Sequence, residues 1–188
     1  MEKKSDKGFA IRVATEADAP ALKALIEASV HGLQAGDYSQ AQRDAAVGVH
    51  LGVDSQLIAD RTYFVVSPQA QPEVMAACGG WSRRQTLFGA DRRPDRDASL
   101  LDPAVDAARI RAFFVHPDWA RQGIGSLLLQ YCEDAARAEG FRRFEMGATL
   151  TGVPLYRRWG YEETGRIELE LGDGLTLPIV RMGKTDRE

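Results

Sequence analysis

Two glycines separated by one isoleucine, Gly123 and Gly125, lie where the chain could bind a phosphate group. An apolar run ends just before Pro117, and the residues after the first glycine place Ile124, Leu127, Leu128 and Tyr131 at helical spacing. This order predicts a strand, a turn and a helix that starts at the glycines. The first helical turn leaves amide N–H groups without intrahelical partners, and glycine lets a ligand approach them closely. Such a helix start is suited to bind phosphate.

The neighbouring residues exclude two common nucleotide-binding loops. A Walker loop requires Lys followed by Ser or Thr after its last glycine, whereas Ser126 and Leu127 follow Gly125. A dinucleotide fingerprint requires a third glycine, and Leu128 occupies that position. The ligand that carries the phosphate is therefore of another kind.

The glycine segment resembles the pyrophosphate loop of the GCN5-related N-acetyltransferase (GNAT) superfamily. That loop has Gln or Arg, two variable residues, Gly, one variable residue, and Gly or Ala; the span 120–125 matches its glycines but starts with Ala120. The resemblance implies an acetyl-CoA site with no metal. Its pantetheine arm would bind the backbone of Phe113, Phe114 and Val115. Its pyrophosphate would bind the loop residues Arg121, Gln122, Gly123, Ile124, Gly125 and Ser126.

The segment 153–161 resembles the terminal helix of the same family, in which a tyrosine precedes a Gly-aromatic pair by four residues. The resemblance implies that Tyr156 donates a proton to the departing CoA thiolate. The pKa of a phenol is about 10 and that of a thiol about 8.5, so tyrosine is protonated at neutral pH and can act as an acid. The alternative is that Tyr156 only packs beside Leu155 and Trp159.

The residues that would deprotonate an amine acceptor are not evident. Some GNAT members carry a glutamate on the central strand, but the corresponding residue here is Arg109, which cannot act as a base. Glu145, His116 and His31 stay open as candidates, and no base is assigned.

The acceptor pocket is expected beside the loop 31–38, with His31, Tyr38 and Arg109 as substrate residues. Arg109 and Arg111 alternate on one face of a strand. They could receive a carboxylate or phosphate of the acceptor, or they could pair with nearby aspartates; both readings stay open.

The elements that must position these residues follow from apolar periodicity and turn signals. Strands are expected over 11–13, 62–66, 74–81, 110–115, 141–146, 167–171 and 175–180. Helices are expected from near Pro20 to Val30, over 40–47 after a capping box at Ser39, and over 124–138. The strands at 62–66 and 74–81 should pair antiparallel, and Pro178 should confine the last strand to an edge or a bulge.

This order predicts a single-domain α/β fold with a mixed, mostly antiparallel sheet and helices on both faces. The resemblance further implies that the central parallel strands splay apart. The GNAT domain is expected over 9–183, between a disordered tail at 1–8 and a second tail at 184–188. An irregular insertion at 82–107 is either a lid or a solvated loop.

Charge and composition narrow the partners. The chain has 188 residues with 24 basic and 27 acidic ones, a net charge of −3, so neither nucleic acid nor an anionic membrane is expected as a partner. The absence of a long apolar run and the charged opening indicate a cytoplasmic protein. Cys78 and Cys132 lack metal-ligand spacing and are expected to be buried thiols.

The expected function is an acyltransferase that passes the acetyl group of acetyl-CoA directly to a primary amine of a small molecule or peptide. The alternative is a non-catalytic acyl-CoA sensor, because no base is evident. Whether the protein forms a homodimer stays open.

Overall fold

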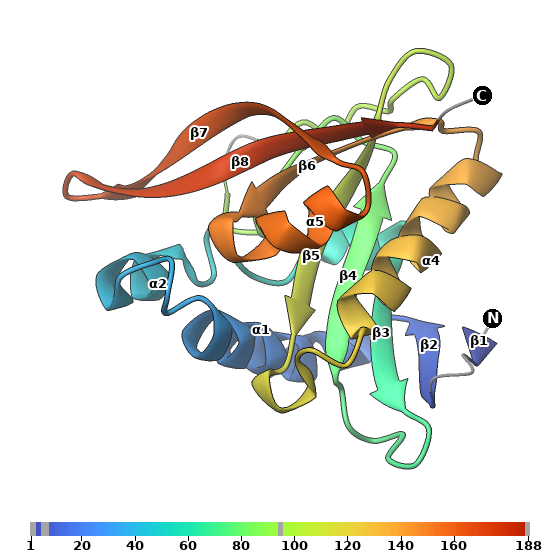
Figure 1. Cartoon of the computed structure of the whole chain (residues 1–188), viewed down its shortest axis with the longest axis horizontal. Helices are drawn as coiled ribbons and strands as arrows, with labels where there is room; N and C mark the ends of the chain where they lie inside the picture. The colour runs from blue at the N-terminus through green and yellow to red at the C-terminus, as the bar shows by residue number, and fades with distance from the viewer. Residues whose placement is uncertain (1–2, 5–7, 94–95, 187–188) are drawn as a thin grey trace.

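An eight-stranded sheet runs through the residues that the computed structural model describes, which are 3–4, 8–93 and 96–186 (Figure 1). Its spatial order is β1-β2-β3-β4-β5-β6-β8-β7, and β5–β6 is its parallel pair. The strands are β1 (Lys3–Lys4), β2 (Phe9–Val13), β3 (Tyr63–Pro68), β4 (Ala77–Ser82), β5 (Ala108–Val115), β6 (Arg143–Thr149), β7 (Glu162–Gly172) and β8 (Leu175–Thr185).

Helices cover both faces of the sheet, as expected. They are α1 (Ala19–Leu33), α2 (Gln40–Ala46), α3 (Ser55–Ala59), α4 (Ile124–Ala138) and α5 (Val153–Arg158), with short 3-10 turns η1 (Glu16–Asp18), η2 (Pro117–Trp119) and η3 (Leu150–Gly152). Alternate residues of β3 serve the two layers: Phe64 lies in the core with α4, and Val65 lies in the core with α1. This alternation is the two-residue period of a strand buried on both faces.

The expected splay of the central strands is confirmed. β5 and β6 pair at Ala108 with Phe144 and at Arg109 with Glu145, and the strands then diverge (Figure 1). On the other side of β5, the register with β4 shifts between Cys78 and Gly80. Ala112, at this bulge, has a φ of 55°, a left-handed conformation that costs an L-residue roughly 1–2 kcal/mol. One strained residue thus lies where the sheet opens.

Pro178 was expected to confine the last strand to an edge or a bulge, and this holds only locally: β8 as a whole lies between β6 and β7, but at Pro178 it is paired on the β7 side alone. Pro178 pairs with Glu168 of β7, whereas the ladder with β6 ends one residue away, at Thr149 and Ile179. Proline is tolerated because no β6 residue stands opposite it to require an N–H donor.

β8 also continues through Lys184 and Thr185, into the span expected to be a C-terminal tail. At the other end, Lys3 and Lys4 pair with Ile11 and Ala10, whereas a disordered tail was expected there.

The segment between β4 and β5 has no helix or named strand in its described part, 83–93 and 96–107. Ion pairs attach it to the domain: Arg84 lies 2.6 Å from Asp60, and Arg96 lies 2.6 Å from Asp54 and 3.0 Å from Asp91. An isolated antiparallel bridge joins Arg84 to Leu100. The segment is therefore held against α3 by charged side chains.

Candidate active site

The glycine loop has the geometry that a helix start requires. α4 begins at Ile124, and Gly123 caps it with a φ of 81°, a left-handed conformation open to glycine at little cost. The first hydrogen bond of the helix runs from the amide of Leu127 to the Gly123 carbonyl over 3.0 Å. The amides that precede Leu127 in the first turn therefore have no partner within the helix. The Gln122 side chain donates to the Asp118 carbonyl over 3.3 Å and braces the loop.

A cavity of about 420 Å³ opens above this loop. It lies between the end of β5, the loop after η2, the start of α4, and α5. The residues expected to bind the cofactor that line it are Phe113, Val115, Arg121, Gly123, Ile124, Gly125 and Ser126. Phe114 lines a different cavity, and Gln122 lines neither. The Ser126 hydroxyl accepts a hydrogen bond from the Trp159 indole over 3.1 Å, which joins α4 to the end of α5.

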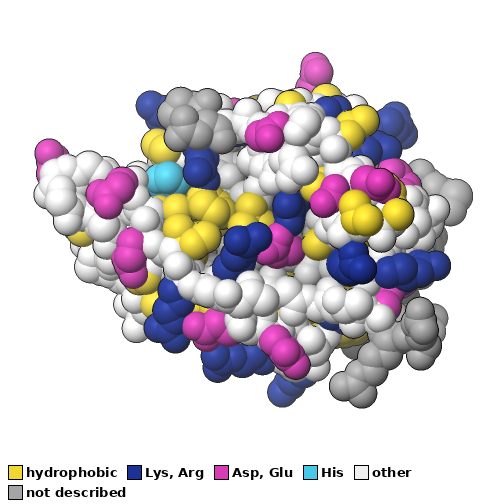
Figure 2. Space-filling view, turned by 90° about the horizontal axis from the view of Figure 1, so that it is seen from above, with side chains coloured by type: hydrophobic (Ala, Val, Ile, Leu, Met, Phe, Trp, Pro, Cys, Tyr) yellow, Lys and Arg dark blue, Asp and Glu magenta, His cyan; other side chains and the backbone are white. Residues whose placement is uncertain are grey.

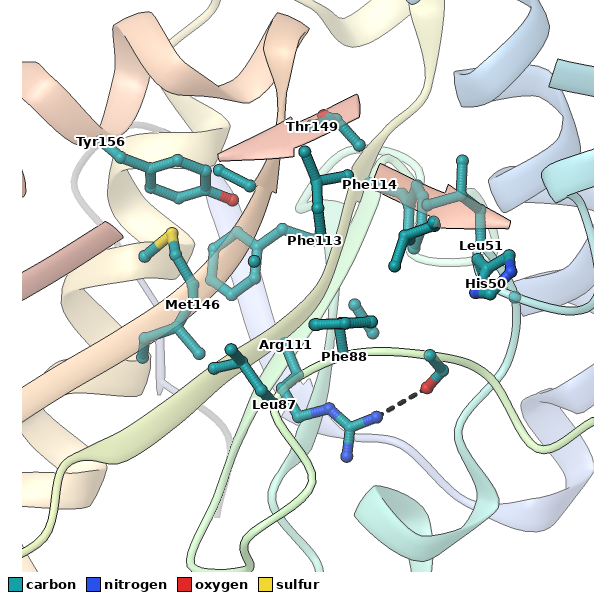
Figure 3. Close-up of a pocket in the computed structure, with 18 residues that line it drawn as sticks. His50, Leu51, Leu87, Phe88, Arg111, Phe113, Phe114, Met146, Thr149 and Tyr156 are labelled. Carbon is teal, nitrogen blue, oxygen red and sulfur yellow. Dashed lines mark hydrogen bonds between the residues drawn. The ribbon is translucent and has the colours of Figure 1, made fainter. Parts of the chain in front are cut away.

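A second cavity, of about 70 Å³, lies on the other side of the splayed strands (Figure 3). Residues of β5, β6, β7, β8, the turn 50–52 and the segment 87–89 line it. Figure 2 shows hydrophobic side chains gathered in a hollow on the face that carries the β7–β8 hairpin. The second cavity is thus bounded largely by apolar groups from segments far apart in sequence.

Three residues, Phe113, Thr149 and Tyr156, line both cavities. The Phe113 and Tyr156 rings meet edge to face, with centroids 6.4 Å apart. Because β5 and β6 separate after Arg109, no strand pairing closes the gap between the two cavities. Ligands bound in the two cavities could therefore meet at these three residues.

Tyr156 is held by its ring. It is 7% exposed, and its ring contacts that of Tyr161 edge to face, with centroids 6.0 Å apart. Among the described residues, none forms a hydrogen bond with its hydroxyl. Burial raises the pKa of Tyr156 above its ordinary value, so the phenol stays protonated throughout the neutral range.

The structure places Tyr38 in the core, outside the lining of both cavities. Its hydroxyl donates to the Pro178 carbonyl and accepts from the Leu150 amide, each over 2.8 Å. Tyr38 thus connects the loop after α1 to β8 and η3. Burial raises the pKa of Tyr38 to about 12.

His31 also lies outside both linings, with its Nδ1 3.7 Å from an Asp44 carboxylate oxygen.

Both strand arginines pair with carboxylates, which is one of the two readings that the sequence left open. Arg109 pairs with Glu145, which also pairs with Arg181. Arg111 lies 2.8 Å from Asp54 and donates to the Gly89 carbonyl over 2.6 Å. Arg109 and Glu145 lie outside both cavity linings, whereas Arg111 lines the second cavity.

The remaining candidate base, His116, caps η2: its Nδ1 accepts from the Asp118 amide over 3.3 Å. Like Glu145, it lines neither cavity. No candidate base proposed from sequence therefore reaches the place where the cavities meet.

Sequence reasoning missed His50, which lines the second cavity. Its Nε2 lies 3.1 Å from the Glu170 carbonyl, which can only accept, so Nε2 is the donor of this hydrogen bond. Nδ1 is buried and has no partner among the described residues. No local motif marks His50, because it reaches the cavity only through the packing of its turn against β7.

Within 3–4, 8–93 and 96–186, no group of three or more His, Cys, Asp or Glu side chains is arranged to hold a metal ion. In the same part of the chain, no helix combines the length and apolar character that crossing a membrane requires.

Comparison with known proteins agrees with this geometry. Residues 85–163 match the family model described as an acetyltransferase (GNAT) domain. A search of curated proteins found no match. Among solved structures, a GCN5-related N-acetyltransferase from Rhodopseudomonas palustris is 22% identical, with a TM-score of 0.67 over 93% of this chain and 94% of that one.

Two similar structures contain a coenzyme. The PaiA N-acetyltransferase from Thermoplasma acidophilum, in complex with coenzyme A, is 13% identical, with a TM-score of 0.62 over 94% of this chain and 98% of that one. The yncA protein from Salmonella typhimurium, with its cofactor acetyl-CoA, is 17% identical, with a TM-score of 0.61 over 96% and 95%. The resemblance to the GNAT superfamily is thereby confirmed, in sequence over 85–163 and in fold over nearly the whole chain.

Proposed function

We propose that the protein transfers the acetyl group of acetyl-CoA directly to a primary amine. The observation that carries this proposal is the meeting of two cavities at Phe113, Thr149 and Tyr156. One cavity ends in a glycine-capped helix start, which suits a pyrophosphate, and the other is separate from it. Two ligands held in this way have their reacting groups adjacent, which removes much of the entropic cost of bringing them together.

Acetyl-CoA would lie in the larger cavity. Its pyrophosphate would accept hydrogen bonds from the amides at the start of α4, around Gly123 and Gly125. Its pantetheine arm would follow β5 at Phe113 and Val115, where divergence from β6 leaves backbone groups that need a partner. The thioester would then reach Tyr156.

The reaction needs one new bond and one broken bond. The neutral amine nitrogen attacks the thioester carbonyl carbon, the C–N bond forms, and the C–S bond breaks. The leaving thiolate takes the proton of the Tyr156 hydroxyl, which burial keeps protonated. The nitrogen loses its proton to water, and water returns a proton to the tyrosinate, so no protein base is assigned.

The experiment is an acceptor screen that follows CoA release from acetyl-CoA, with a control for hydrolysis without acceptor. Acceptor-dependent release, with the acetylated amine found by mass spectrometry, supports transfer. Binding of acetyl-CoA with no release above hydrolysis for any amine would instead favour a sensor, the reading to which the missing carboxylate base points.

A further inference from the structure

The second cavity has a composition that selects among amines. Its volume is about 70 Å³, and apolar side chains dominate the lining (Figure 3). The apolar side chains that form its body are Leu51, Leu87, Phe88, Met146, Leu169 and Ile179. An engineered apolar cavity that binds benzene measures about 150 Å³, so a cavity of roughly half that volume suits a body of about three carbon atoms, such as the isopropyl end of a branched amine.

No acidic side chain lines this cavity in the described part of the chain. A second ammonium group on the acceptor would therefore be buried without a counter-charge, which is costly in an apolar site. Asp54 contacts the lining residue Arg111, but its carboxylate is already paired with Arg96 at 2.6 Å and with Arg111 at 2.8 Å. Polyamines and lysine-like acceptors are disfavoured for this reason.

An acceptor with a carboxylate finds no better partner. Arg111 is the cationic side chain in the lining, and its guanidinium is engaged by Asp54 and by the Gly89 carbonyl (Figure 3). Arg111 is 5% exposed, and breaking its pair would leave Asp54 buried with less compensation. Amino-acid acceptors are therefore disfavoured as well.

The other polar side chains of the lining lie at opposite ends of the cavity. Thr149 and Tyr156 lie at the cofactor side, and His50 lies across the cavity beside Leu51 (Figure 3). Resting on the proposed function, we propose that the acceptor is a compact apolar primary amine without a second charge. Its nitrogen faces Thr149 and Tyr156, and its carbon chain fills the apolar part.

The test compares isoamylamine with putrescine and glycine on the full chain. CoA release is measured with acetyl-CoA, and binding of each amine is measured by calorimetry on protein saturated with CoA, where no transfer occurs. We expect isoamylamine to bind and to have a kcat/KM about tenfold or more above the other two, a difference of about 1.4 kcal/mol. Equal or better use of putrescine or glycine would overturn the inference and leave acetyl transfer intact.

Measuring amine binding separately from CoA release distinguishes failure of the cavity assignment from failure of acetyl transfer. If isoamylamine binds the CoA-saturated protein but releases no CoA from acetyl-CoA, the cavity assignment stands and transfer fails. If isoamylamine does not bind, the cavity assignment fails whatever the activity with other amines.

A matched pair of variants tests the cavity directly. Leu87→Asp places a carboxylate in the lining, whereas Leu100→Asp makes the same change on the same segment at a side chain 64% exposed. We expect Leu87→Asp to lower kcat/KM for isoamylamine and raise it for putrescine, and Leu100→Asp to change neither. Unchanged preference in a folded Leu87→Asp protein would contradict the inference. If that variant does not fold, Phe88→Ala widens the cavity and should shift preference from isoamylamine to hexylamine; no shift would also contradict it.

Discussion

Tyr156 offers the sharpest change at the scale of one residue. Its ring packs against Phe113 and Tyr161, while none of the described residues bonds its hydroxyl. Tyr156→Phe should therefore keep the free energy of unfolding and the acetyl-CoA dissociation constant. Turnover should fall by on the order of 10² to 10⁴, the usual contribution of a general acid. Steady-state kinetics, calorimetry and urea unfolding measure the three quantities, and full turnover would remove the hydroxyl from the mechanism.

The thiol of Cys78 leads to a prediction about how the stability of the fold depends on pH. Burial raises the pKa of its thiol to about 12 from 9.0, although Tyr63 donates a hydrogen bond to the sulfur over 3.3 Å. The folded state therefore favours the protonated thiol. This contribution to stability is complete below pH 9 and is lost as pH rises towards 12.

The thiolate is the reactive form, so Cys78 should resist alkylation by iodoacetamide at pH 8 in the native protein and react in urea. Peptide mass spectrometry after each treatment measures the labelling. Fast native labelling of Cys78 would mean that the β4 bulge opens readily.

Among the elements, the start of α4 has a backbone conformation that suits glycine and amide groups that favour a negatively charged ligand. Gly123 has a left-handed φ of 81°, so both Ala and Asp at this position add strain, roughly 1–2 kcal/mol for an L-residue. Only Asp adds a negative charge beside the expected pyrophosphate, and two unit charges about 4 Å apart near a surface interact by roughly 1–4 kcal/mol. Gly123→Asp should thus bind acetyl-CoA about tenfold or more weakly than Gly123→Ala at similar stability. Equal affinities in calorimetry would make Gly123 a turn residue only.

A buried charge cluster joins α4 to β8. Glu133 is 1% exposed and contacts Arg137 at 2.9 Å, Lys184 at 2.8 Å and the Tyr161 hydroxyl at 2.9 Å. Glu133→Ala takes the carboxylate partner from Lys184 and the acceptor from the Tyr161 hydroxyl, whereas Arg137 keeps its pairs with Asp134 and Asp186; the loss of these buried contacts should lower the free energy of unfolding by about 3–5 kcal/mol. Glu139→Ala, at the exposed end of the same helix, removes a surface pair with Arg83 and should cost about 0–1 kcal/mol. Urea unfolding of both variants tests the contrast, and equal losses would contradict it.

At the scale of the whole molecule, a ligand selective for the folded state must raise the melting temperature. Acetyl-CoA at about 100 times its dissociation constant adds about 2.7 kcal/mol. For a domain of this size, each kcal/mol corresponds to roughly 2–4 °C, so a rise of roughly 5 to 10 °C is expected. Differential scanning fluorimetry measures it, with Gly123→Asp as the control that should respond only at higher concentration. No rise in the folded wild-type protein would contradict acetyl-CoA binding.

Features that depend on neighbours along the chain could be predicted from the order of residues. The helix 124–138 starts and ends where its glycines and apolar spacing indicate. The capping box of Ser39 and Gln42 forms in both directions, and Pro20 stands in the first turn of α1. The glycine loop was accessible for the same reason, since a turn, a cap or a helix face needs only residues a few positions apart, whereas Tyr156 was singled out through the resemblance of 153–161 to the GNAT superfamily.

The contacts that residues make across the domain could not be predicted in this way, because they depend on how the elements pack. Tyr38 belongs to the core because its hydroxyl satisfies Leu150 and Pro178, and His50 reaches the second cavity through its contact with β7. Asp54, at the start of α3, pairs both with Arg111 of β5 and with Arg96 of the long segment between β4 and β5. These contacts join segments that lie tens of residues apart in the sequence, and packing and desolvation select them without any local signal. The proposed acceptor side of the site therefore depends on contacts that form only when both faces of the sheet are in place.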